Sequence, residues 1–120
     1  MSLLRPILSA GFLLALTAHA QEFKCPSYQG KNPLFNADVF DGPPEKNVQL
    51  EPDASRGNKS YTYALWKIGY LFDLGSTPFL VCKFAGLGDA QSMTIKVDKR
   101  VEQCVFRTHG GGQPAEAECK

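Results

Sequence analysis

The stretch YTYALWKI, residues 61–68, alternates between two kinds of side chain and indicates the fold of the chain. One face of an extended strand would hold the small and apolar side chains of Ala64, Trp66 and Ile68. The opposite face would hold both tyrosines and two further side chains: Tyr61, Tyr63, Leu65 and Lys67. A period of two is typical of a β-strand. We therefore expect the tryptophan side to face a core and the tyrosine side to be partly solvated.

Similar segments follow downstream and are rich in aromatic and β-branched residues: PFLVCKFAG (78–86), SMTIKV (92–97) and VEQCVF (101–106). Gly, Pro, Asp and Ser separate them, as expected for turns. NVQLE (47–51) predicts one earlier strand, and no window has the apolar spacing of a confident helix. The sequence therefore predicts an all-β or mainly β domain, built as a small antiparallel meander or a two-layer sheet and stabilised by disulfides.

The first twenty residues are predicted to be a secretory signal peptide. An apolar run, Ile7 to Leu16, precedes Ala18-His19-Ala20, a small-x-small pattern typical of cleavage before Gln21. The run is too short to span a bilayer as a helix. We therefore expect residues 21–120 to form a single small β domain that is periplasmic or secreted and leaves the membrane after cleavage.

Basic and acidic residues nearly balance, with 13 Lys and Arg against 12 Asp and Glu. The basic residues are scattered along the chain. Nucleic acid is a poor candidate partner, because such binding depends on clustered positive charge.

Four cysteines lie in the exported part: Cys25, Cys82, Cys104 and Cys119. An even number in an exported chain indicates disulfides, and no close pair such as C-x-x-C suggests a metal site. Cys82 shares a strand face with Leu80 and Phe84, and Cys104 with Phe106, so both point inward. This favours Cys82–Cys104 with Cys25–Cys119, if the two strands are neighbours or face each other across layers. Sequence alone leaves all three pairings open.

The carboxylates of residues 38–53 are the first candidates for chemistry. Asp41, Glu45, Glu51 and Asp53 lie close together, but Asp41-Gly42-Pro43-Pro44 and Glu51-Pro52-Asp53 are built from turn formers. Carboxylates on flexible turns would not hold the fixed separation that glycosidases need, and the register of a calcium loop is absent. We therefore predict no metal and no cofactor, and keep a small cell-wall hydrolase as an alternative.

The segment THGGGQP, residues 108–114, contains the one histidine of the exported chain, His109. His-Gly-Gly-Gly also occurs in the oxyanion-hole loop of some esterases, but no G-x-S-x-G elbow follows it here. Such a Gly-rich composition predicts a flexible C-terminal tail over about residues 108–120. No catalytic residue is predicted, so an enzyme is not expected.

What remains is a surface suited to contact. Tyr61, Tyr63 and Lys67 are candidate binding residues, because stiff rings with a polar tip are favoured in protein interfaces. The adjacent loop DASRGNKS (53–60) would form the rim. The leading hypothesis is a non-catalytic module of inhibitor or immunity type that binds another periplasmic or secreted protein. In the alternatives the tyrosines merely cover a sheet, or the domain carries a small ligand.

Several motifs resemble those of a family of small exported proteins of Gram-negative bacteria: Cys25-Pro26, VFDGPPE, LEPD, LWKI, FLVCKFAG and Gln103-Cys104. The resemblance spans nearly all of the exported chain. It implies a periplasmic protein and lends no mechanism.

Overall fold

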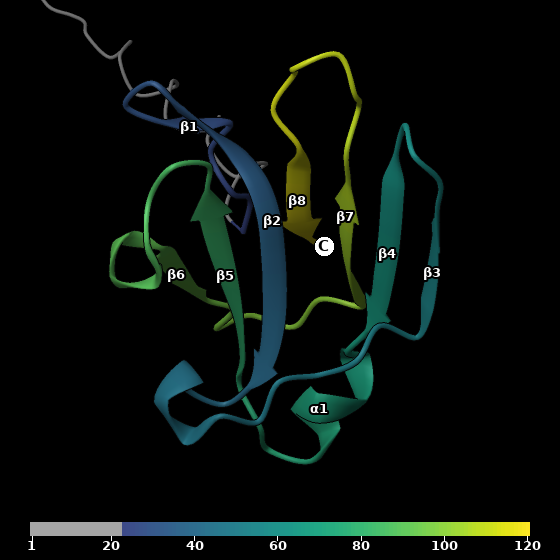
Figure 1. Ribbon diagram of the computed structural model, residues 1–120. Helices are drawn as coiled ribbons and strands as arrows, with labels where there is room; N and C mark the ends of the chain where they lie inside the picture. The colour runs from purple at the N-terminus through teal and green to yellow at the C-terminus, as the bar shows by residue number, and fades with distance from the viewer. Residues whose placement is uncertain (1–22) are drawn as a thin grey trace, which may run out of the picture.

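The computed structural model of the chain describes residues 23–120, and the predicted signal peptide lies outside them. Two four-stranded antiparallel sheets make up the fold (Figure 1). The first sheet has the order β1-β2-β5-β6, with the bounds Tyr28–Gln29, Asn32–Asp41, Pro78–Phe84 and Met93–Lys96. The second has the order β3-β4-β7-β8, with the bounds Ala54–Gly57, Thr62–Lys67, Gln103–Arg107 and Glu116–Cys119. Within residues 23–120 the short helical turns are α1 (Gly69–Asp73) and the 3₁₀ segments Pro44–Lys46 and Asp89–Gln91. The predicted mainly β, disulfide-stabilised fold is confirmed.

The two sheets form layers that are offset from each other. Across the layers β2 contacts β7 and β5 contacts β8. Figure 1 shows β4 and then β3 lying beyond β7, on the side away from β8. The inner faces of β3 and β4 therefore extend past the edge of β2.

The core lies between the two layers. It contains the side chains that the two-residue period of the sequence predicted to face inward. Ala64 and Trp66 of β4 are buried, as is Ile68 just after it. Leu80, Cys82 and Phe84 of β5 belong to the same apolar cluster as Cys104 and Phe106 of β7. Alternation therefore predicted the inward faces of these strands correctly.

The longest strand, β2, was not predicted. Its sequence, NPLFNADVFD, contains few β-branched residues, and the register to β5 shifts between Leu34 and Asn36. This bulge breaks the two-residue period that sequence analysis looks for. The strand predicted over residues 47–51 is reduced to one bridge, between Phe40 and Gln49.

Two further elements lie in segments predicted as connections. β3 occupies part of the predicted loop 53–60 and pairs with β4, with Arg56 opposite Tyr63. All four of its residues are exposed, so no alternation marks it. The helix α1 lies in the connection 69–77, and five residues are too few to show a helical period.

The four cysteines form two disulfides, but not the favoured pairing. The bonds are Cys25–Cys82 and Cys104–Cys119, with Cα–Cα distances of 5.8 and 3.9 Å. Cys82 does not meet Cys104 because β5 lies over β8 rather than over β7. Cys104 is instead directly opposite Cys119 in the β7–β8 register. The N–H of Cys25 donates to Ala117 O at 2.9 Å, so Cys25 runs beside β8 and joins this edge to the first sheet.

The segment expected to be a flexible tail contains the strand β8. Ala117 and Cys119 are buried, and Ala115 N–H donates to Leu34 O at 2.9 Å. The three glycines of the His-Gly-Gly-Gly string belong to the turn between β7 and β8. Gly110, Gly111 and Gly112 all have positive φ, a conformation that glycine adopts without the steric cost of a Cβ.

Replacing Gly110 with alanine is expected to lower the free energy of unfolding by about 1–2 kcal/mol, the usual cost of a left-handed L-residue. Its φ is +73°, and an added Cβ would lie 3.0 Å from Ser60 O. Urea unfolding measures the difference. Gly88→Ala is the matched control, because φ is −80° there and nothing lies near the added Cβ. Equal costs at the two positions would contradict the strained turn.

Candidate protein-binding surface

The outward face of the second sheet carries the residues predicted to bind a partner. Along β4, Tyr63 and Leu65 are half-buried and Lys67 is exposed, while Ala64 and Trp66 point into the core. Tyr61 lies just before the strand and is 41% exposed. The structure therefore brings the tyrosines and Lys67 to one solvent-facing surface, which we call the outer face.

Neighbouring strands extend the outer face on both sides of β4. On the β3 side, the Arg56 guanidinium lies 5.0 Å from the centroid of the Tyr63 ring, a cation–π contact that holds the ring in place. On the β7 side, Val105 is directly opposite Leu65. These two side chains form an apolar centre, because paired residues of antiparallel strands share a face.

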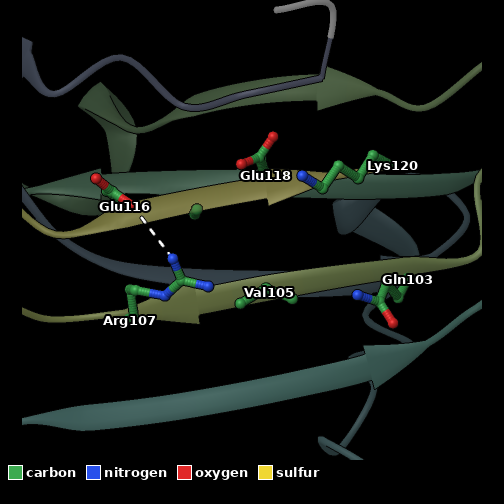
Figure 2. A pocket seen from close by; sticks show the side chains of 7 residues that line it. Gln103, Val105, Arg107, Glu116, Glu118 and Lys120 are labelled. Carbon is green, nitrogen blue, oxygen red and sulfur yellow. Dashed lines mark ion pairs between the residues drawn. The ribbon is translucent and has the colours of Figure 1, made fainter.

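A shallow hollow of about 120 Å³ continues the outer face across β7 and β8 (Figure 2). Its lining residues are Gln103, Val105, Arg107, Glu116, Ala117, Glu118 and Lys120. Figure 2 shows Arg107 reaching toward Glu116, with Arg107 Nη1 and Glu116 Oε1 3.6 Å apart. His109 Nε2 lies 3.3 Å from the other carboxylate oxygen of Glu116. Glu116 is thus flanked by two basic side chains.

Charged side chains of both signs surround the apolar centre, and Lys120 adds a positive charge next to the carboxylates of β8. Basic side chains come from β3, β4 and β7: Arg56, Lys67 and Arg107. The carboxylates of Glu116 and Glu118 come from β8. An apolar centre with a charged rim is the usual anatomy of a protein–protein interface.

Three acidic residues of the segment 38–53 belong to its turns and strand contacts. Asp53 Oδ2 accepts from the N–H of Lys67 at 2.6 Å, which fixes the chain before β3 to the end of β4. Asp38 Oδ2 pairs with Lys83 Nζ at 2.9 Å. Asp41 ends β2, and Gly42 follows with φ +89°, as turn chemistry predicts. These contacts hold turns and strands together.

Arg56 lies in the loop 53–60, which the sequence predicted as the rim of the surface. The part of the outer face on β7 and β8 was not predicted: Val105, Arg107, Glu116, Glu118 and Lys120. A signal was present in EAEC, residues 116–119, whose two glutamates alternate with alanine and cysteine. That pattern is typical of a strand with one buried and one wet face.

Fold and surface together define a small, disulfide-linked β-sandwich of the protein-binding class. The family described as Type VI secretion system Tli immunity protein matches residues 29–120. The chain belongs to this family. No curated protein and no solved structure was found to match it.

Family membership confirms the leading hypothesis. The protein is a non-catalytic, periplasmic immunity protein that acts by binding a partner protein, a secreted toxin effector. The prediction that it is not an enzyme is confirmed with it, and the hydrolase and carrier alternatives lose their support. Within residues 23–120, no helix is long and apolar enough to cross a membrane.

Proposed function

We propose that the protein binds its toxin effector through the outer face of the second sheet. The observation that carries this proposal is the apolar pair Leu65 and Val105 at the centre of a charged, solvent-facing surface. Tyr61 and Tyr63 flank this pair and supply large contact area with few rotatable bonds. Lys67 and Arg56 supply positive charge at the rim, which steers association with an acidic patch on the effector.

Inhibition by this surface needs no chemistry from the immunity protein. A tight complex that covers a functional surface of the effector is sufficient. The four strands span roughly 14 Å across and roughly 17 Å along, from ordinary strand spacings. That footprint is small beside the ~800 Å² per partner of a standard interface. The effector is therefore expected to contact the protein beyond the edges of the sheet as well.

Truncating both tyrosines tests the surface. Tyr61→Ala combined with Tyr63→Ala is expected to weaken effector binding by roughly 30-fold or more, since a buried interface tyrosine contributes about 1–2 kcal/mol. The dissociation constant is measured by calorimetry with effector captured from type VI-secreting cells. Co-expression with the effector gives a second measurement, because the variant should protect cells less well.

Two other tyrosines provide a matched control. Tyr28 on β1 and Tyr70 on α1 are 51% and 54% exposed and lie away from the outer face. Tyr28→Ala with Tyr70→Ala should leave the dissociation constant unchanged. A stronger loss for this pair than for Tyr61 and Tyr63 would move the interface elsewhere.

We also propose that cleavage after Ala20 releases a mature chain, a single domain beginning at Gln21. The motif Ala18-His19-Ala20 supports this site. The intact mass of protein recovered from the periplasm tests it. A mass that corresponds to another first residue would overturn it.

A further inference from the structure

A groove of about 290 Å³ lies on the inner side of β3 and β4, opposite the outer face. It exists because the sheets are offset, so the inner faces of these two strands extend beyond the edge of β2 (Figure 1). Ala64, Trp66 and Phe106 supply apolar lining, and Ser55 and Asn36 lie among the polar lining residues. Its volume is roughly twice that of the ~150 Å³ cavity known to hold a benzene. One long side chain with part of a neighbour would fit.

Hydrogen bonds hold one wall of the groove in place. Trp66 Nε1 donates to Leu50 O at 3.1 Å, and Leu50 N–H donates to Val39 O at 2.8 Å. The segment 49–52 is thereby fixed between β2 and β4. The groove is therefore preformed, which lowers the entropic cost of binding.

The exposed edge of β2 is poorly suited to pair with an added strand. The β-bulge between Leu34 and Asn36 interrupts its regular register. The N–H of Ala37 is already bonded to Asn36 Oδ1 at 2.9 Å. Bulges and occupied donors are features that prevent edge-to-edge pairing. The groove is thus suited to inserted side chains rather than to a pairing strand.

The charged residues that line the groove are both acidic, Asp38 and Glu51. Asp38 is already paired with Lys83, and Gln49 Nε2 donates to Asp38 Oδ1 at 3.1 Å. The hydrogen bond to Asp38 raises the pKa of Lys83, so the Lys83 ammonium stays charged at neutral pH. Glu51 is exposed and forms no ion pair with any residue between 23 and 120. An available carboxylate beside an apolar floor suits a cation on a long aliphatic stem.

We propose that this groove receives a loop of the toxin effector that inserts an arginine or lysine, its charge meeting Glu51 and its stem lying over Trp66. This inference rests on the proposed function, because the effector must contact more than the outer face. The outer face and the groove are the two sides of the β3–β4 hairpin, and all of β3 is exposed. A partner that wraps around β3 would contact both the outer face and the groove.

Short peptides test the groove without the effector. In ¹⁵N NMR titrations, acetyl-Gly-Leu-Arg-Leu-Gly-amide is expected to shift the indole N–H of Trp66, the chain's one tryptophan, with a dissociation constant on the order of 1 mM. The same peptide with glutamate in place of arginine should leave the Trp66 indole signal unshifted. Glu51→Gln should weaken the arginine peptide about 3- to 10-fold, the size expected for loss of a charge-assisted bond. Glu45→Gln, outside the groove, should have no effect. No shift at Trp66, or equal shifts from both peptides, would overturn the inference.

A second pair of variants fills the groove. Ser55 is exposed, lies opposite Ala64 and lines the groove, so Ser55→Phe should abolish the peptide shifts. Ala54→Phe places the same ring on the other face of β3 and should leave them intact. With the effector, Ser55→Phe is expected to weaken binding at least tenfold. If it does not, while the Tyr61 and Tyr63 variant does, the groove inference fails and the proposed outer face stands. If Ser55→Phe weakens effector binding and the Tyr61 and Tyr63 variant does not, the proposed role of the outer face fails instead.

Discussion

Replacing Cys25 and Cys82 together with alanine is expected to lower the free energy of unfolding by about 4 kcal/mol, the chain-entropy value for a loop of this size. The two residues are 57 positions apart, and their bond joins the edge beside β8 to the first sheet. The total free energy of unfolding of a small domain is only about 5–15 kcal/mol. The variant should therefore be partly unfolded at physiological temperature.

The second disulfide provides the comparison. Cys104 and Cys119 are separated by 15 positions and pair adjacent strands of one sheet. Their replacement is expected to cost about 3 kcal/mol by the same chain-entropy argument. Urea unfolding of the two double variants, followed by far-UV circular dichroism, gives both values. A larger cost for Cys104 and Cys119 would show that the link between the layers is not the dominant constraint.

Local alternation accounts for the strands that the sequence predicted correctly. YTYALWKI contains β4, whose inward and outward side chains alternate along its length. PFLVCKFAG contains β5, where Leu80, Cys82 and Phe84 face inward as expected and Val81 is buried as well. β2 and β3 could not be found this way. One carries a bulge, and the other is exposed along its whole length, so neither has an alternating pattern.

The disulfide pairing depended on contacts that no local pattern reveals. Inward orientation of Cys82 and Cys104 was correct, but orientation does not say which strands lie across from each other. The partner of Cys104 is set by the β7–β8 register. That register depends on a glycine turn, Gly110 to Gly112, whose composition alone is typical of a flexible tail.

The outer face was predictable from local sequence along β4 and in the adjoining loop 53–60, which contains Arg56. The outward direction of Tyr63 and Lys67 follows from their own positions in β4. Val105 and Arg107 join them through pairing with β7, about 40 positions further along the chain. Which strands pair is decided by tertiary packing, so the apolar centre and the hollow became visible only in the structure.

A charge at the apolar centre of the outer face should have the largest effect on binding. Leu65→Glu is expected to weaken the effector complex by at least about 100-fold, because burying an unpaired carboxylate in an interface costs several kcal/mol. Leu65 is half-buried beside Val105, so the glutamate can remain solvated in the free protein and the fold should persist. Glutamine has a similar shape to glutamate but no charge, so Leu65→Gln should weaken the effector complex less than Leu65→Glu does.

Thr94→Glu decides whether that loss is specific to the outer face. Thr94 lies on β6 of the first sheet and is exposed, so the same substitution adds the same charge on the other side of the sandwich. It should leave the dissociation constant within about twofold, since charges far from an interface act mainly through screened fields. Unfolding curves for all three variants separate binding from stability. If Leu65→Glu binds as tightly as Thr94→Glu, Leu65 does not lie at the centre of the interface.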